Sequence, residues 1–147
     1  MSNANNLMTT AWKDIPVAQV LPTGTWRLRC KSASYKPARE EGKSDTVLIV
    51  YEAVEPMEDV SEDAIAELGE GYDYSMKAIF HRVWIKEEAD MDKFRSLLAK
   101  HNIDVADYAN GMEAMKALKG TVVLGFLQQS TYKDNTENTV ANFSAAE

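Results

Sequence analysis

The stretch Thr25-Trp26-Arg27-Leu28-Arg29-Cys30-Lys31-Ser32-Ala33-Ser34-Tyr35-Lys36 alternates between apolar and polar side chains with a period of two. This period is typical of a β-strand whose two faces have different surroundings. We expect the apolar face to be buried, and it holds Trp26, Leu28 and Cys30. The opposite face is cationic and aromatic, and it carries Arg27, Arg29, Lys31 and Tyr35.

The cationic strand lies in an acidic chain. The 147 residues have a net charge of -7, so the positive charge on this strand is a local feature. Residues 27–43 contain six basic and two acidic side chains, whereas residues 52–73 contain nine acidic side chains and no basic one. We therefore expect a dipolar molecule in which one region receives a polyanion and another repels it.

The length and composition predict one domain. A chain of 147 residues with 45% hydrophobic residues is long enough for one buried core. We predict a flexible N-terminal arm over residues 1–14 and a single domain over residues 15–147. The only cysteine, Cys30, excludes an internal disulfide. No segment has the pattern of a signal peptide or a membrane-spanning helix, so we expect a cytoplasmic protein without a membrane partner.

The remaining segments predict four more strands and three helices. Strand-type residues occupy 46–54, 72–85, 121–132 and 139–144. Helical patterns occupy 62–68, 87–101 and the segment between Asn110 and Gly120. Polar loops fill 37–45, before the second strand, and 133–138, before the last one.

Three strands, a helical segment and two strands are the element order of the OB-fold, a five-stranded Greek-key barrel. We therefore predict a mainly β, α+β fold: an OB-fold-like barrel with a helical insertion between the third and fourth strands. In that fold, the exposed face of strands two and three and the loops 1–2 and 4–5 bind oligonucleotides and oligosaccharides. Here the first of these loops carries Lys36, Arg39 and Lys43, and the second is flanked by Tyr132 and Lys133.

Binding of a single strand requires cations that follow the phosphates and flat side chains on which bases stack. The predicted nucleic-acid-binding residues are Arg27, Arg29, Lys31, Tyr35, Lys36, Arg39, Lys43, Lys77, Arg82, Tyr132 and Lys133. Further stacking candidates are Tyr51, Tyr74 and Trp84, although an aromatic residue in an alternating strand is more often part of the core. The alternative interpretation is that Arg27, Arg29 and Lys31 only keep an exposed strand face soluble.

Signals for catalysis are weak. His81 and His101 are the only histidines, they lack ligand spacing, and one cysteine cannot complete a zinc site. The sequence has no glycine-rich phosphate loop and no nucleophile elbow. The acidic segment 55–70 lacks the residue order of a calcium loop. We therefore expect no enzyme, cofactor or metal, and we interpret the acidic segment as a solvated face that repels nucleic acid.

Several short motifs extend along the chain from about Leu21. They are Leu21-Pro22-x-Gly24-x-Trp26-Arg27-Leu28, Tyr35-Lys36, Ile79-Phe80-His81-Arg82-Val83-Trp84 followed by Phe94 and Leu97-Leu98, Leu118-Lys119-Gly120, and Tyr132 followed by Asn138-x-Val140-x-x-Phe143. In these motifs the sequence resembles the small OB-fold single-stranded DNA-binding proteins of tailed bacteriophages. The resemblance implies a protein that coats and protects single strands during phage DNA replication and recombination in the cytoplasm of the infected bacterium. It implies contacts through Arg27, Arg29, Tyr35, Lys36 and Tyr132, and phage replication proteins as further partners.

A second class of function stays open at this point. The chain fits a structural or protein-interaction phage protein, either a virion component or an acidic inhibitor that imitates DNA through residues 52–73. This alternative would be favoured if the protein co-purified stably with a protein partner and lost that partner when the acidic side chains of the segment were replaced by neutral ones. An exposed strand edge would also allow pairing with a second copy of the chain.

Overall fold

The protein is mainly β. The structure, a computed structural model, describes residues 8–9, 11–12 and 18–146, so most of the predicted arm over residues 1–14 lies outside the described residues. The strands are β1 (Gly24–Lys36), β2 (Asp45–Pro56), β3 (Ile79–Ile85), β4 (Val122–Tyr132) and β5 (Asn135–Ala145). The helices are α2 (Glu62–Glu67), α3 (Glu88–Lys100) and α4 (Gly111–Lys116), with 3-10 turns η2 (Tyr74–Met76) and η3 (Val105–Asp107).

All five strands belong to one antiparallel sheet with the order β3-β2-β1-β4-β5. The sheet curls until its two edge strands approach each other, and the rings of His81 in β3 and Phe143 in β5 meet edge to face at 4.8 Å. Among the described residues no backbone pairing joins these two strands. The predicted five strands and the helical insertion between β3 and β4 are confirmed, and the curled, open sheet is compatible with a barrel-like fold.

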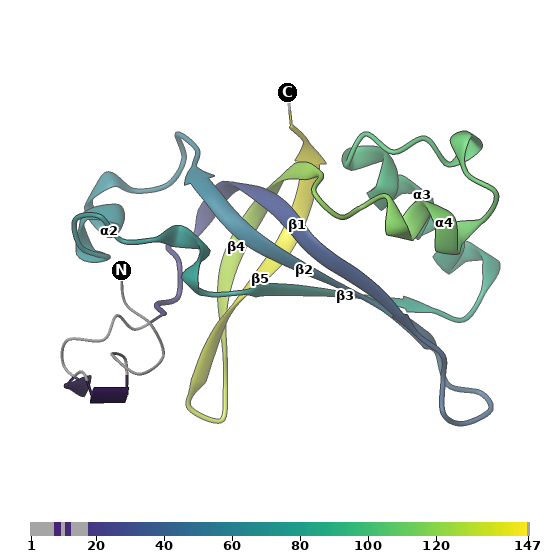
Figure 1. The fold of residues 1–147 in the computed structure, drawn as a ribbon, viewed down its shortest axis with the longest axis horizontal. Coiled ribbons are helices and arrows are strands. Elements are labelled where there is room, and N and C mark those ends of the chain that lie inside the picture. Colours follow the sequence, from purple (N-terminus) through teal and green to yellow (C-terminus); the bar gives the residue numbers. More distant parts are fainter. Residues whose placement is uncertain (1–7, 10, 13–17, 147) are drawn as a thin grey trace.

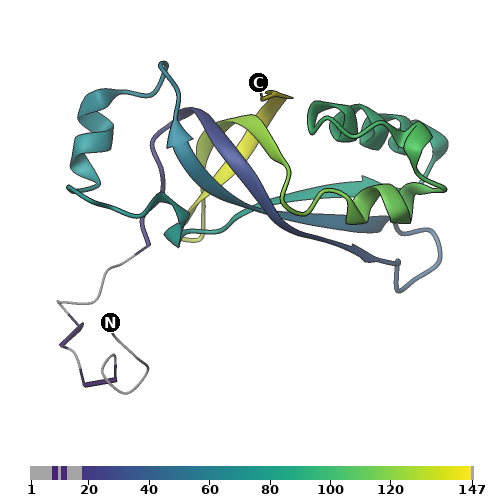
Figure 2. The same ribbon diagram turned by 45° about the horizontal axis from the view of Figure 1, so that its top comes forward.

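The helices lie at two ends of the curled sheet. Figures 1 and 2 show α3 and α4 together at one end and α2 at the opposite end. Helix α3 begins with a capping box between Glu87 and Asp90, and it buries Phe94, Leu97 and Leu98. A buried side chain of this size contributes about 1.5–3 kcal/mol through the hydrophobic effect, so α3 is fixed to the sheet by its apolar side. No helix within the described ranges has the length and apolar character needed to cross a membrane.

The core follows the alternation of the strands. Trp26 and Leu28 of β1 are fully buried, as the sequence predicts, and so is Tyr51 of β2. Cys30 is buried as well, and its burial raises the pKa of the thiol to about 11. The suggestion that Tyr51 offers a surface for base stacking is therefore wrong, because its ring is part of the core.

A β-bulge at Lys31 changes the alternation of β1, because the pairing with β2 skips this residue. Before the bulge, Arg27 and Arg29 face outwards. Beyond it, Tyr35 lies opposite the buried Val47, and residues directly opposite each other in an antiparallel pair share a face. The prediction that Tyr35 lies on the same face as the two arginines is therefore wrong.

The third strand is shorter than the predicted segment 72–85. The carboxylate of Asp73 accepts hydrogen bonds from the backbone N–H of Ser75 at 2.9 Å and from its hydroxyl at 2.6 Å. Such local bonds compete with the strand ladder and favour a turn, so the chain forms η2 before β3 begins. The ring of Tyr74 in this turn packs edge to face on Trp26 at 5.1 Å, which makes it part of the core rim and removes it as a stacking candidate.

The connection between β4 and β5 is also tighter than predicted. Instead of a loop over residues 133–138, the hairpin turns through Lys133 and Asp134, which have φ angles of 49° and 64°. Two successive residues with positive φ are typical of the two-residue turns that match the twist of a hairpin. As a result, Tyr132 stands at the end of a long hairpin instead of beside a loop.

Candidate nucleic-acid interface

The outer face of β3 presents two exposed aromatic rings and a cation. Phe80 and Trp84 are 54% and 58% exposed, and Arg82 lies between them in the same phase. The guanidinium of Arg82 lies 5.6 Å from the centre of the Trp84 ring, within the range of a cation–π interaction. About half of each ring is therefore accessible to a ligand from solution.

The loop between β1 and β2 adds further cations beside this strip. A hollow of about 300 Å³, which we call the hairpin groove, is formed by the loop, the start of β2 and the end of β3. Its charged and aromatic lining residues are Lys36, Arg39, Lys43, Arg82 and Trp84. They come from two separate segments, residues 36–43 and 82–84, and the antiparallel pairing of β2 with β3, in which Thr46 lies opposite Trp84, brings these segments together.

The four cations of the hairpin groove are free of ion pairs within the part of the chain that the structure describes. Their charge is therefore available to an anion from solution. Loop residues Glu40 and Glu41 are exposed and do not line the groove. The combination of unpaired cations and an exposed indole ring is the arrangement that a splayed, negatively charged strand requires.

Three other predicted cations are paired with carboxylates. Arg27 Nε lies 3.0 Å from Glu55 Oε1, and Arg29 Nη1 lies 3.0 Å from Glu52 Oε1, both across the β1–β2 ladder. Lys77 Nζ lies 3.4 Å from Oε2 of Glu137 on β5. Exposed pairs of this kind contribute only about 0–1 kcal/mol to stability, but each cancels the local positive charge.

Lys31, Tyr132 and Lys133 lie outside the hairpin groove. Lys31 is exposed at the bulge of β1. Tyr132 is 73% exposed at the β4–β5 turn, and the ammonium of Lys133 lies 5.3 Å from the centre of its ring. Figure 1 shows this turn and the β1–β2 loop along the lower edge of the view, with β3 running between them. The hairpin groove is lined by the β1–β2 loop and not by the β4–β5 turn.

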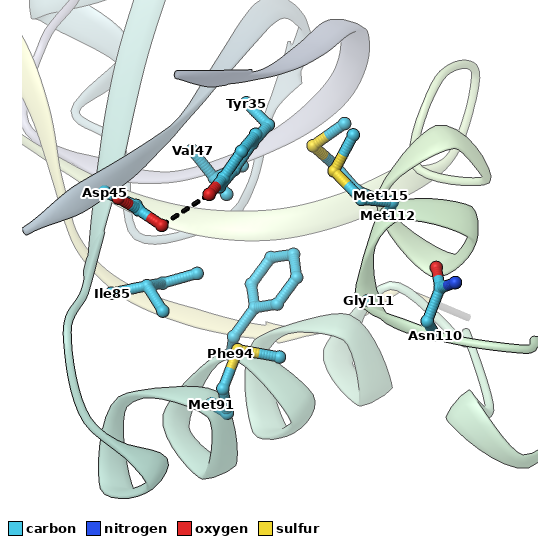
Figure 3. A pocket seen from close by; sticks show the side chains of 10 residues that line it. All are labelled: Tyr35, Asp45, Val47, Ile85, Met91, Phe94, Asn110, Gly111, Met112 and Met115. Atoms are coloured by element: carbon cyan, nitrogen blue, oxygen red, sulfur yellow. Dashed lines mark hydrogen bonds between the residues drawn. The ribbon is translucent and has the colours of Figure 1, made fainter. Parts of the chain in front are cut away.

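Tyr35 has a role that the sequence did not indicate. Its hydroxyl donates a hydrogen bond to Asp45, which raises the pKa of Tyr35 and lowers the pKa of Asp45. Figure 3 shows this pair above an apolar pocket of about 310 Å³ between the hairpin and the helices. Tyr35 therefore lies under the β1–β2 loop, on the face opposite the hairpin groove, and it is not placed to stack on a strand bound there.

Both histidines pack against the core. His101 is 2% exposed, with Nδ1 2.8 Å from the carbonyl oxygen of Leu97 and Nε2 2.8 Å from the hydroxyl of Tyr51. Burial lowers the pKa of His101, and it also lowers that of His81. Within the described ranges no three His, Cys, Asp or Glu side chains are grouped so as to hold a metal ion.

The acidic segment lies away from the hairpin groove. Its carboxylates Glu62, Asp63 and Glu67 are exposed on α2, and Figure 1 shows this helix at the end of the molecule opposite α3 and α4. The charge segregation expected from the sequence is therefore present only in part: the carboxylates of α2 lie apart from the cations, whereas Glu52 and Glu55 of the same acidic segment pair with Arg29 and Arg27. Comparisons of the chain with protein-family models and with curated proteins gave no match, so the assignment of a function rests on this geometry.

Proposed function

We propose that the protein binds single-stranded DNA without strong sequence preference, through the hairpin groove and the exposed outer face of β3. The single observation that carries the proposal is the convergence in one hollow of the exposed ring of Trp84 and four cations that have no ion-pair partner among the described residues. The cations would contact phosphates, and Trp84 and Phe80 would stack on bases. No catalytic group, cofactor or metal takes part.

A single strand fits this surface better than a duplex. Bases in a duplex are stacked on each other, so their flat faces cannot reach a protein side chain, whereas a single strand can splay its bases onto aromatic rings. Phe80 and Trp84 are four residues apart on one strand, which corresponds to roughly 13 Å at 3.3 Å per residue. Two rings at that separation would receive two bases of one extended strand.

The topology supports an OB-fold-like interpretation. Three features agree with a five-stranded Greek-key barrel: the strand order β3-β2-β1-β4-β5, the approach of β3 to β5, and the helices between β3 and β4. In that fold the ligand lies on the face of the second and third strands, beside the loop between the first and second. The hairpin groove occupies the corresponding place. We propose a role in phage DNA replication and recombination, with phage replication proteins as partners.

A fluorescence titration with oligo-dT tests the proposal. In a Trp12→Phe background, Trp84 is the exposed tryptophan, since Trp26 is fully buried. Quenching by oligo-dT should therefore report contact with the outer face of β3. If all four groove cations contact phosphates, the logarithm of the affinity should fall with the logarithm of the salt concentration with a slope of about -3.

A duplex control completes the titration. A duplex of the same length should bind more weakly than oligo-dT, because only the single strand offers base faces to Trp84. Absence of salt-sensitive binding at micromolar protein would reject the proposal. It would favour the alternative of an interaction protein that uses the acidic surface of α2.

A further inference from the structure

A second hollow adjoins the hairpin groove along the free edge of β3. We call it the edge cleft; it has a volume of about 450 Å³ and lies between β3, β5 and α3. Arg82 and Trp84 line both hollows. The edge cleft therefore adjoins the hairpin groove at these two side chains, and a strand that passes over Trp84 could reach either hollow.

The charged groups of the edge cleft favour an anion. Lys93 and Lys100 of α3 and Arg82 of β3 line it, against the single carboxylate of Asp90. Oδ2 of Asp90 already accepts the backbone N–H groups of Lys86 and Glu87, at 2.9 and 3.0 Å. Neither lysine takes part in an ion pair among the residues that the structure describes.

The floor of the edge cleft suits a nucleobase. The lining includes the apolar side chains of Leu97, Val140 and Phe143, of which Leu97 and Phe143 are each 8% exposed, and the side chain of Asn142. Within the described ranges, β3 pairs only with β2 and β5 only with β4, so the facing strand edges keep backbone donors and acceptors unused by the sheet. Apolar surface with a few polar groups is the usual composition of a small-ligand site, and its typical volume of about 300–1,000 Å³ includes this one.

We propose that the edge cleft holds one nucleotide of the bound strand, beyond those that lie in the hairpin groove. This inference rests on the proposed function and extends it. The base would lie against Phe143 and Val140, and the adjoining phosphates would contact Lys93 and Lys100. An extended peptide could also pair with a free strand edge, but three cations around the opening favour the nucleotide.

The test uses oligo-dT of increasing length and the full chain. The wild-type protein should gain affinity when the oligomer becomes long enough to enter the edge cleft. A Lys93→Glu, Lys100→Glu variant should lose that gain. It should bind short oligomers with the affinity of the wild type, and long oligomers more weakly than the wild type. If two phosphate contacts are lost, the salt slope for long oligomers should become shallower by about 1.4. Between 50 and 200 mM salt the wild type would then lose about sevenfold more affinity than the variant.

Arg95→Glu provides a matched control on the same helix. Arg95 does not line the edge cleft, and it lies 3.8 Å from Asp92. This variant should keep the length dependence of the wild type. If charge reversal disturbs folding, the neutral variant Lys93→Gln, Lys100→Gln serves in its place and should also lose the gain in affinity for long oligomers. The proposal would be overturned if affinity depended on oligomer length equally in the lysine variants, Arg95→Glu and the wild type. It would also be overturned if the edge cleft bound an extended peptide while DNA binding stayed unchanged. A wild type that binds no oligomer of any length would instead reject the proposed function itself.

Discussion

Tyr35 and Asp45 join the two sides of the β1–β2 loop at its base. The hydroxyl of Tyr35 donates to Oδ2 of Asp45 (Figure 3). Oδ1 of the same carboxylate accepts the backbone N–H of Ala38 at 2.8 Å. One side chain therefore connects the end of β1, the start of the loop and the start of β2. Because the loop carries Arg39 and Lys43, this connection sets where those cations lie relative to Arg82.

Asp45→Asn should weaken binding of oligo-dT. Removing a negative charge near the hairpin groove would by itself strengthen the attraction to phosphate, whereas loss of the hydrogen bond would release the loop. We expect the release to dominate, because an amide nitrogen in place of Oδ2 cannot accept from Tyr35. Tyr35→Phe should also weaken binding of oligo-dT, and it does so without a change of charge. Affinity is measured by the oligo-dT titration.

Glu41→Gln removes an equal charge from the β1–β2 loop, four residues before Asp45, without removing a hydrogen bond of the described residues. This variant should bind slightly more tightly than the wild type. Trypsin gives a measurement that does not depend on DNA. Cleavage after Arg39 and Lys43 should be faster in Asp45→Asn and Tyr35→Phe than in the wild type. If Asp45→Asn binds as tightly as Glu41→Gln, the loop does not depend on this carboxylate.

Trp84→Ala should lower the affinity for single strands by about 5- to 150-fold, which corresponds to about 1–3 kcal/mol for one stacked base. Isothermal calorimetry with oligo-dT measures this change. Trp84→Phe should recover part of it, because a smaller ring still stacks. The melting temperature of both variants should stay close to that of the wild type, since the side chain is largely exposed. Unchanged affinity in Trp84→Ala would remove the stacking role.

Arg82→Gln and Arg29→Gln form a matched pair of substitutions. Arg82 lines the hairpin groove without an ion pair among the described residues, whereas Arg29 is paired with Glu52 at 3.0 Å. We expect Arg82→Gln to weaken binding and to make the salt slope shallower by about 0.7, with a much smaller effect for Arg29→Gln. The opposite ranking would mean that the outer face of β1 is the binding surface.

The stability of the domain should depend on pH through its two histidines. His101 and His81 pack on Phe143, with ring centres 5.9 and 4.8 Å from it, and Tyr51 donates to His101. Burial lowers the pKa of both, and the charge of His101 lowers that of His81 further. The unfolded chain therefore takes up protons at about pH 6.5, before the folded protein does.

The stabilisation by the neutral histidines is thus complete above pH 6.5 and is lost as the pH falls below it. The melting temperature should decrease between pH 7 and 5.5, and this decrease should be smaller in His81→Gln. Thermal unfolding followed by circular dichroism measures it. An identical pH dependence in His81→Gln and the wild type would contradict the account.

Much of the architecture could be predicted from hydrophobic periodicity. The alternation of β1 up to Cys30 and the helical spacing of Phe94, Leu97 and Leu98 each specify an element and its buried side, whereas the alternation of β3 specifies a strand but not which of its faces is buried. The ranges of β2, α3 and β4 differ from expectation by at most two residues at either end. The bulge at Lys31 could not be predicted, since no glycine or proline accompanies it. One skipped residue was enough to move Tyr35 to the other face.

The candidate site could be predicted only in part. The loop cations Lys36, Arg39 and Lys43 were identified because their loop is polar and cationic. The pairing of Arg29 with Glu52 depends on the register between two strands, which a sequence pattern does not determine. The outward position of Trp84 could not be predicted, because an aromatic residue in a strand fits a core as well as a binding surface.

The most direct test of the central claim is a map of the residues that oligo-dT touches, from backbone amide chemical shifts of labelled protein. The account predicts the largest shift changes at residues 36–44 and at Phe80, Arg82 and Trp84, with none on α2. Changes concentrated on α2, or spread evenly over the sheet without the β1–β2 loop, would contradict it.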